Sequence, residues 1–368
     1  TKTMKEKSYT NGITTKREVE PLANATVFRT LKEFENSRFG LGFMGTSLIR
    51  KFDEPGLENS FSRNSFTGGI DGWINFDSAK VYVMNGYFMM SNINGTKDFI
   101  TELQKRPIHS FQRPDAKYQK LDTNATSLNG WAGRITFNKQ EGEFYFNAAL
   151  GAISPGFNSN DLGFSWRTSY INGHLVTGYR DYKEDSWSRS KSIYAGYFRS
   201  YNFDGDKEAD GIFTMGNLWM KNFHRLRFNF GVNFESYSTR HTRGGPTVKL
   251  PEGYNGAIGF STDQRKDITI DGDFYYGGDA LGGNNYSLQL GGSWRASEVV
   301  RLTIYPGYEW NYDAGQWIAN YDDPAAVNTY GTRHIFGFLD QKTLFATIRL
   351  DYTFTPTMSL QLFAQPFI

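Results

Sequence analysis

The chain has 368 residues and a formal net charge of +2, with 40 Lys and Arg residues scattered among 38 Asp and Glu residues. This balance argues against a dedicated nucleic-acid surface, and the absence of cysteine excludes a disulfide framework and a thiolate metal site. Only 39% of the residues are hydrophobic, yet 17% are aromatic, a mixture typical of a β-barrel whose strands face lipid on one side and water on the other.

Period-two alternation of apolar and polar residues predicts about sixteen β-strands. We therefore predict one transmembrane, antiparallel up-and-down β-barrel over 26–368, preceded at 1–25 by an external loop or the start of a fragment. In chain order the predicted strands are 26–35, 37–50, 65–77, 80–92, 127–139, 143–154, 162–176, 188–203, 211–222, 225–237, 254–266, 268–277, 286–296, 301–312, 343–355 and 359–368.

The clearest alternation is RLRFNFGVNFES, residues 225–236. Leu226, Phe228 and Phe230 fall on one face of such a strand, whereas Arg227 falls on the other. A water-soluble sheet would bury the apolar face against a second layer, but a transmembrane barrel would turn that face to lipid. This strand alone leaves both alternatives open.

The connections between the strands decide between these alternatives. Those after the odd-numbered strands are mostly tight turns, with 177–187 as the exception, whereas those after the even-numbered strands are long. Short turns on one rim and long loops on the other are typical of an outer-membrane barrel, so the apolar faces are predicted to point to lipid. The long connections are 51–64, 93–126, 155–161, 204–210, 238–253, 278–285 and 313–342, of which 51–64, 93–126, 238–253 and 313–342 are the main external loops.

Three irregular stretches are predicted on the long-loop rim. TKDFITELQK, within 93–126, predicts a short helix in an external loop. FQRPDA (111–116) and SPGFNSNDLGF (154–164) are richer in Gly, Pro, Asn and Asp than a strand could use. These two either fold over the barrel mouth as a constriction or only shape the loops as turns, and the sequence does not separate these alternatives.

Charged residues in mid-strand, opposite the apolar face, are candidates for the wall of a water-filled lumen. We expect Arg295, Arg349 and Asp351 to join a cross-strand ionic network there. The lumen-facing candidates are Arg227, Arg295, Arg301, Glu309, Arg349 and Asp351.

The segment DGDKEAD, residues 204–210, holds the carboxylates Asp204, Asp206, Glu208 and Asp210 at alternate positions. Oxygen ligands in this pattern are a weak candidate for a Ca²⁺ site, and the ordinary interpretation, a solvated acidic loop, is favoured. No other cofactor is expected. The five histidines are isolated in sequence, which favours lone surface or lumen histidines over a metal site, and no G-x-S-x-G nucleophile motif occurs.

Five irregular stretches occur in the order REVEPLANATVFRTLKEFENS (17–37), FQRPDA (111–116), TSLNGWAGRI (126–135), SPGFNSNDLGF (154–164) and LDQKTLFATIRLDYTFTPTMSLQLFAQPF (339–367). Together they resemble one family, the outer-membrane barrel domain of unknown function that commonly follows a family-nine-like carbohydrate-binding module in bacteria of the Bacteroidota and Gemmatimonadota type. The resemblance spans roughly 17–368, and it implies a barrel fold. The carbohydrate-binding module is absent here, and the family has no agreed catalytic residues to transfer.

The strand pattern and the resemblance predict an integral β-barrel of a Gram-negative outer membrane, and not an enzyme. Its expected role is a porin-like transport conduit, or a membrane anchor for a partner module that binds carbohydrate. The alternatives are a structural subunit of a larger outer-membrane assembly with a plugged lumen and, third, a barrel-embedded hydrolase. The expected partners are the lipid bilayer, a carbohydrate ligand bound through a module absent from this chain, and other outer-membrane proteins, with no nucleic acid.

The predicted topology also bears on the number of strands. The first and last predicted strands both have their free ends on the long-loop rim, whereas bacterial barrels ordinarily begin and finish on the short-turn rim. We therefore expect at least one further strand before Thr1 and one after Ile368, or eighteen or more in the complete barrel.

Overall fold

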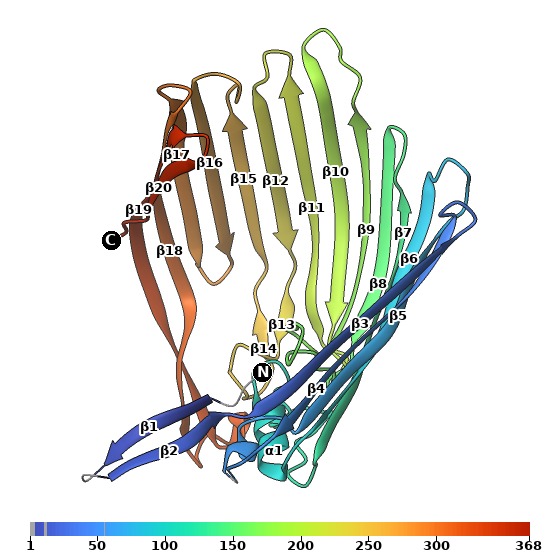
Figure 1. The fold of residues 1–368 in the computed structure, drawn as a ribbon, viewed down its shortest axis with the longest axis vertical. Coiled ribbons are helices and arrows are strands. Elements are labelled where there is room, and N and C mark those ends of the chain that lie inside the picture. The colour runs from blue at the N-terminus through green and yellow to red at the C-terminus, as the bar shows by residue number, and fades with distance from the viewer. Residues whose placement is uncertain (1–3, 11–12, 55) are drawn as a thin grey trace.

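A computed structural model describes residues 4–10, 13–54 and 56–368. Sixteen strands form a single antiparallel sheet in which every strand pairs with its neighbours along the chain (Figure 1). This confirms the predicted all-β, up-and-down fold with sixteen strands. The outermost strands are the first and the last, and within the described residues these two do not pair with each other. No helix of the described residues is long and apolar enough to cross a bilayer.

The strands of the large sheet are long, and only small elements lie outside the sheet. The sheet contains β3 (Leu22–Phe34), β4 (Phe39–Lys51), β5 (Asn64–Asn75), β6 (Tyr82–Asn94), β7 (Ser127–Lys139), β8 (Phe144–Ile153), β9 (Tyr170–Asp181), β10 (Ser188–Tyr201), β11 (Lys207–Met220), β12 (Arg225–Asn233), β15 (Gly253–Ser261), β16 (Ile268–Asp279), β17 (Asn284–Arg295), β18 (Val300–Asp322), β19 (Thr332–Thr355) and β20 (Met358–Ala364). Outside it lie the hairpins β1 (Met4–Thr10) with β2 (Ile13–Glu20) and β13 (Ser236–Ser238) with β14 (Val248–Leu250), the helix α1 (Lys97–Lys105), and the 3₁₀ turns η1 (Leu57–Asn59) and η2 (Val327–Thr329).

The connections are sorted between the two rims. Tight turns such as 35–38 and 221–224 lie at the upper rim in Figure 1, whereas α1 and the β13–β14 hairpin lie at the lower rim. The 35–38 turn closes through three consecutive residues with positive φ, Glu35, Asn36 and Ser37, which lets two long strands reverse over a few residues.

Three predicted boundaries are wrong. The range 313–342 is mostly paired strand, because β18 and β19 continue as a two-stranded ladder beyond their neighbours, with two register shifts. Within 4–10 and 13–25 the chain forms the β1–β2 hairpin and the start of β3, so of the two interpretations of 1–25 the external loop is wrong there. The strand predicted at 162–176 is β9, Tyr170–Asp181, because the residues before it belong to the connection, where Thr168 is 5% exposed and bonds to Ile108 O instead of joining the sheet. The connection to β10 is therefore short, as on the rest of that rim.

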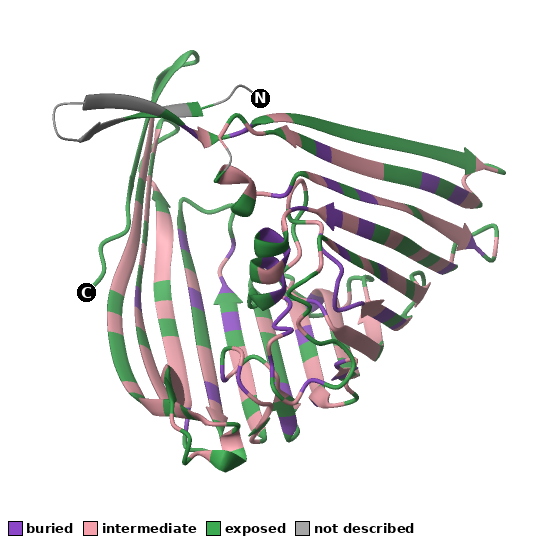
Figure 2. Cartoon of the chain, turned by 90° about the horizontal axis from the view of Figure 1, so that it is seen from below, coloured by how far each residue is buried: buried purple, intermediate pink, exposed green. Residues whose placement is uncertain are grey.

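The sheet is rolled so that α1 lies inside its curve (Figure 2). On the concave face, Ser91 Oγ of β6 accepts a hydrogen bond from Asn158 N at 2.9 Å, and Ile93 and Leu128 pack in one cluster with α1. Residues directly opposite each other on neighbouring strands share a face, so the face of Ser91 can be followed strand by strand from β6 to β18. The odd-numbered residues of β12 and of β15 to β18 therefore lie on the concave face. Their even-numbered neighbours, including Phe228 and Phe230, lie on the convex face.

We call residues 95–126 and 154–169, which fold into the concave side, the plug. Its helix begins at the N-cap Thr96, whose Oγ1 accepts a hydrogen bond from Phe99 N at 3.2 Å, as TKDFITELQK predicts. The buried apolar cluster joins the plug to the wall and comprises Ile93, Phe99, Ile100, Leu103, Phe111 and Leu128. The convex face has no such cover, and Phe230 and Leu290 are 49% and 52% exposed.

Candidate functional site: a polar concave wall and its plug

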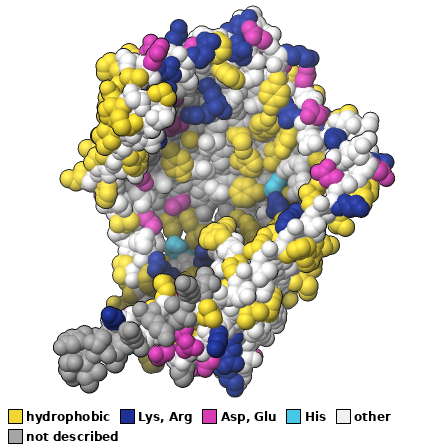
Figure 3. All heavy atoms as spheres, in the orientation of Figure 1, with side chains coloured by type: hydrophobic (Ala, Val, Ile, Leu, Met, Phe, Trp, Pro, Cys, Tyr) yellow, Lys and Arg dark blue, Asp and Glu magenta, His cyan; other side chains and the backbone are white. Residues whose placement is uncertain are grey.

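All six charged residues predicted to face a lumen lie on the concave face. Arg227 lies on β12, Arg295 on β17, Arg301 and Glu309 on β18, and Arg349 and Asp351 on β19. Seen through the opening between β3 and β20, this side of the molecule is hollowed (Figure 3).

Two ion pairs span three strands of this wall by passing over a glycine. Arg227 Nη2 lies 3.0 Å from Asp273, and the register places Gly259 of β15 between them. A Cβ at Gly259 would lie 2.3 Å from Asp273 Oδ1. Arg29 and Asp71 also pair over a glycine of the middle strand: Gly42 lies opposite Asp71, and a Cβ there would lie 2.8 Å from both side chains, although Arg29 itself is opposite Met44. The glycine on the middle strand therefore leaves the room in which each ion pair forms.

The expected network of Arg295, Arg349 and Asp351 does not form. Arg349 Nε lies 3.0 Å from Asp351, two residues along the same strand. Arg295 lies directly opposite Arg301, and in the described part of the chain it has no ion pair. The physical reason is that neighbours on one face of β19 already bring Arg349 and Asp351 together, and the register places a second cation, Arg301, between Arg295 and Asp351.

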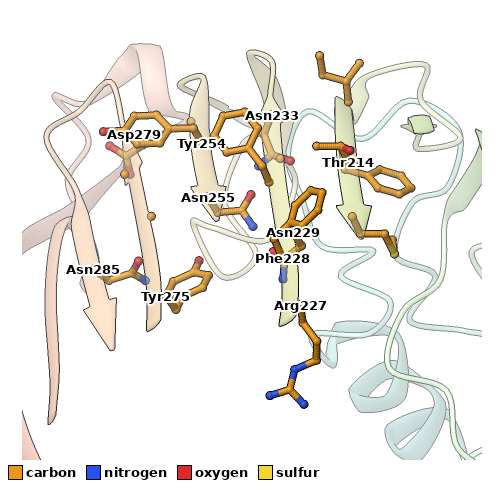
Figure 4. Close-up of a pocket in the computed structure, with 18 of the residues that line it drawn as sticks. Thr214, Arg227, Phe228, Asn229, Asn233, Tyr254, Asn255, Tyr275, Asp279 and Asn285 are labelled. Carbon is orange, nitrogen blue, oxygen red and sulfur yellow. The ribbon is translucent and has the colours of Figure 1, made fainter. Parts of the chain in front are cut away.

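A band of carboxamides crosses the concave wall nearer the long-loop rim. Asn255, Asn285, Asn311 and Gln341 occupy one row of the register, with Gly277 between the first two. Asn255 and Asn285 line a cavity of about 1060 Å³ together with Asn229 and Tyr275 (Figure 4). Carboxamides both donate and accept hydrogen bonds, so this band can solvate polar solutes without a fixed charge of its own.

A buried ion pair anchors the plug to the rim of the sheet. Arg113, in the FQRPDA stretch, pairs with Asp204, and their side chains are 8% and 6% exposed. Asp204 also accepts hydrogen bonds from Lys117 N at 2.8 Å and Tyr118 N at 2.7 Å. Burial raises the pKa of Asp204, but the two N–H groups and the Arg113 guanidinium outweigh burial and hold that pKa below its ordinary value.

Other buried contacts fix the second half of the plug. Asp161 accepts hydrogen bonds from Arg50 Nη2 at 2.9 Å and from Ser62 Oγ at 2.7 Å, which ties the SPGFNSNDLGF stretch to β4. Arg167 pairs with Glu208 at the start of β11. The FQRPDA and SPGFNSNDLGF stretches therefore fold inward over the mouth, and they do more than shape the loops as turns.

The four carboxylates of DGDKEAD do not converge. Asp204 binds Arg113, Asp206 accepts a hydrogen bond from Asn202 Nδ2 at 2.9 Å, and Glu208 binds Arg167. Asp210 lies 2.8 Å from Arg199 and 3.1 Å from Lys207. Within the described ranges, no group of three or more His, Cys, Asp or Glu residues could hold a metal ion. These side chains anchor the plug and the rim.

His109 lies at the centre of the plug, 6% exposed. Its Nδ1 donates to Pro155 O at 2.8 Å, and its Nε2 accepts from Asn158 Nδ2 at 3.0 Å. Asn158 Oδ1 in turn accepts from Asn160 N at 3.0 Å, so the amide cannot turn over without losing that bond. Burial lowers the pKa of His109 to about 4, with the bond to Pro155 opposing and the charge of Arg106 assisting this shift.

We expect the plug to loosen in acid because of His109. Its pKa is about 4 in the docked plug against 6.5 in water, so docking loses up to about 3 kcal/mol as the pH falls from 6.5 to 4. Hydrogen exchange of the α1 amides, corrected for the intrinsic pH dependence, should accelerate over that interval. His109→Gln, which keeps a donor and an acceptor but does not titrate, should abolish the acceleration; an unchanged profile in that variant would contradict the assignment.

Sequence reasoning missed the residues that hold the plug. The FQRPDA and SPGFNSNDLGF stretches stand out by their irregular composition and by the family resemblance, but nothing in the sequence pairs Arg113 with Asp204 or His109 with Asn158. The available signal was that charged and amide residues gather in loops that also hold Pro and Gly, which is typical of loops that form specific polar contacts.

The fold and the wall together define an up-and-down β protein with an apolar convex face and a polar, plugged concave face. The chain belongs to the family described as the domain of unknown function DUF5916, which matches residues 2–368.

Comparison with other proteins gives only distant likenesses. No curated protein matches the chain. Among solved structures, the chain is similar to in-vitro folded OmpT, an outer membrane protein of Vibrio cholerae (10% identity, 90% of this chain and 95% of that chain covered, TM-score 0.32). It is also similar to an anion-selective porin from Comamonas acidovorans (9% identity, 94% and 100% covered, TM-score 0.34).

Proposed function

We propose that this chain spans a bacterial outer membrane as a β-barrel and serves as a conduit for small polar solutes, narrowed at one mouth by the plug. The observation that carries the proposal is that the two faces of one sheet differ in chemistry. The convex face is apolar and uncovered, whereas the concave face carries carboxamides, ion pairs and a folded polar insert. A soluble sheet would bury the apolar face, and a membrane sheet exposes it to lipid.

Aromatic side chains on the convex face support this orientation. Near the long-loop rim, Tyr286 lies with its ring centroid 5.9 Å from that of Tyr308 and 5.2 Å from that of Trp310. Near the short-turn rim, Phe144 lies 5.7 Å from Tyr179. Girdles of aromatic residues at both interfaces are characteristic of outer-membrane barrels.

The edges of the sheet set a condition on the membrane form. Unpaired backbone N–H and C=O groups have no hydrogen-bonding partners in hydrocarbon, so an open sheet edge is not tolerated there. The proposal therefore includes strand partners for the outer edges of β3 and β20 in the bilayer. A partner module that binds carbohydrate, as the family resemblance implies, remains part of the proposal as a ligand-capturing neighbour of the mouth.

Single-channel recording tests the conduit. The purified protein in planar bilayers should give stepwise conductance, and this conductance should rise when the plug is released at low pH. The plug also favours a second candidate, a structural subunit with a blocked lumen. A protein that inserts but conducts neither at neutral pH nor after plug release would overturn the conduit and favour the structural role.

A further inference from the structure

The plug and the long-loop rim enclose a second cavity, of about 710 Å³, which the conduit proposal does not use. It lies between the plug, the loop that holds the β13–β14 hairpin, and the part of β18 that extends beyond the sheet. Asp313 lines both this cavity and the larger one beside the carboxamide band. The two cavities are therefore neighbours on the path from the mouth to the wall.

The charges around this cavity do not balance. Its basic residues outnumber its acidic ones, and the acids already have partners. Glu208 is bound by Arg167 and by Thr239 Oγ1 at 2.7 Å, and Asp313 accepts a hydrogen bond from Gly315 N at 2.8 Å. The basic residues are Lys105, Arg167, Arg240 and Arg243, and the acidic residues are Glu208 and Asp313.

Arg240 and Arg243 are the two guanidinium groups left without a carboxylate. In the part of the chain that the structure describes, neither lies within ion-pair distance of an acid. Arg243 lies over the Trp317 ring with its Cζ 4.1 Å from the centroid, and Arg240 lies 5.7 Å from the Trp166 centroid. Contact with an aromatic face holds a guanidinium in place while leaving its N–H groups free to bind an anion.

The surroundings of Arg240 favour a negative charge. Burial and the positive charge of Arg167 lower the pKa of Arg240, and Glu208 only partly compensates. An oxyanion in the cavity would offset the repulsion between Arg240 and Arg167, and it would accept hydrogen bonds from the unused N–H groups of Arg240. Guanidinium groups bind carboxylate and phosphate oxygens through paired hydrogen bonds.

We propose that Arg240 and Arg243 form a binding site for a small solute that carries a carboxylate or phosphate group, at the mouth of the barrel. His241 also lines the cavity, and its ring is held in place because it stacks on Phe336 at 5.1 Å and its Nε2 donates to Gly315 O at 3.0 Å. The site binds its ligand whether or not the lumen conducts.

Calorimetric titration of the purified protein in detergent tests the site. The probes are succinate for the carboxylate, inorganic phosphate for the phosphate, and glucose as a neutral solute. At least one anion should bind in a one-to-one ratio, and glucose should bind at least tenfold more weakly. Binding should also weaken as the salt concentration rises, because screening reduces the attraction of partly exposed charges.

Variants distinguish this site from general attraction to a basic surface. Arg240→Gln combined with Arg243→Gln should weaken anion binding at least tenfold. Arg189→Gln, at the opposite rim beside Phe223, should leave it unchanged, and far-UV circular dichroism should be the same for all variants. Absence of binding by both anions, or equal binding by the double variant, would overturn the site. Conductance without anion binding would leave the conduit intact and remove this site alone.

Discussion

Replacing Arg113 by alanine should release the plug. Asp204 would be left 6% exposed with no counter-charge, and breaking one partner of a buried ion pair typically costs about 3–5 kcal/mol. The two N–H groups that also bind Asp204 cannot replace a full positive charge. Limited proteolysis within 106–126 should become much faster than in the wild type, and open-channel conductance should rise if the barrel conducts.

A second variant and a matched control make this result specific. Arg113→Ala combined with Asp204→Ala should lower the stabilising free energy of plug docking by less than Arg113→Ala alone, because no uncompensated charge stays buried. Arg63→Ala removes an exposed partner of Glu58, 2.8 Å away on the same rim, and should cost less than about 1 kcal/mol. Equal proteolysis rates for Arg113→Ala and Arg63→Ala would show that the buried pair does not anchor the plug.

Placing arginine at Phe230 should destabilise the folded protein in a bilayer by about 2–4 kcal/mol, provided that this residue lies near the midplane. Phe230 is on the convex face near the middle of β12, 49% exposed, with no protein layer over it. The measurement is urea-induced unfolding in lipid vesicles, followed by tryptophan fluorescence.

The neighbouring position provides the control for this substitution. Asn229 lies on the concave face of the same strand and lines the larger cavity, so Asn229→Arg places the same charge at nearly the same depth but in water. Asn229→Arg should lower the free energy of unfolding by less than about 1 kcal/mol. Similar costs for the two variants would mean that the two faces of β12 do not see different solvents.

Much of the fold could be predicted because it depends on local pattern. Alternation as regular as RLRFNFGVNFES fixes both the strand and its two faces, and turn lengths sort the rims. The predictions failed where tertiary contacts override pattern. Residues 162–169 alternate like a strand but enter the plug, where Thr168 Oγ1 donates to Ile108 O at 2.6 Å. The range 313–342 reads as a loop but forms a ladder, since β18 and β19 pair with each other beyond the sheet.

The candidate site could be predicted only in part. Alternation with apolar residues predicts which face of a strand a charged residue occupies. This correctly predicts that Arg227 lies on the concave face, where it lines the larger cavity. Its partner Asp273 lies two strands away, across a glycine, and no local pattern specifies such a pair. The plug contacts join segments about 90 residues apart, as Arg113 and Asp204 do, so their pairing depends on how the plug folds against the rim of the sheet.

Cysteine scanning of β12 tests the central claim most directly, because the chain has no native cysteine to remove. Single cysteines would be introduced along 226–233 in protein held in lipid vesicles. Their reaction with a membrane-impermeant thiol reagent would be measured, and in a second experiment a fluorophore attached to each cysteine would be exposed to a lipid-soluble quencher. The impermeant reagent should label the odd positions and the quencher should reach the even positions, with a period of two. Even positions protected from the quencher, or equal labelling of both sets by the impermeant reagent, would contradict a sheet that faces lipid with its convex side and water with its concave side.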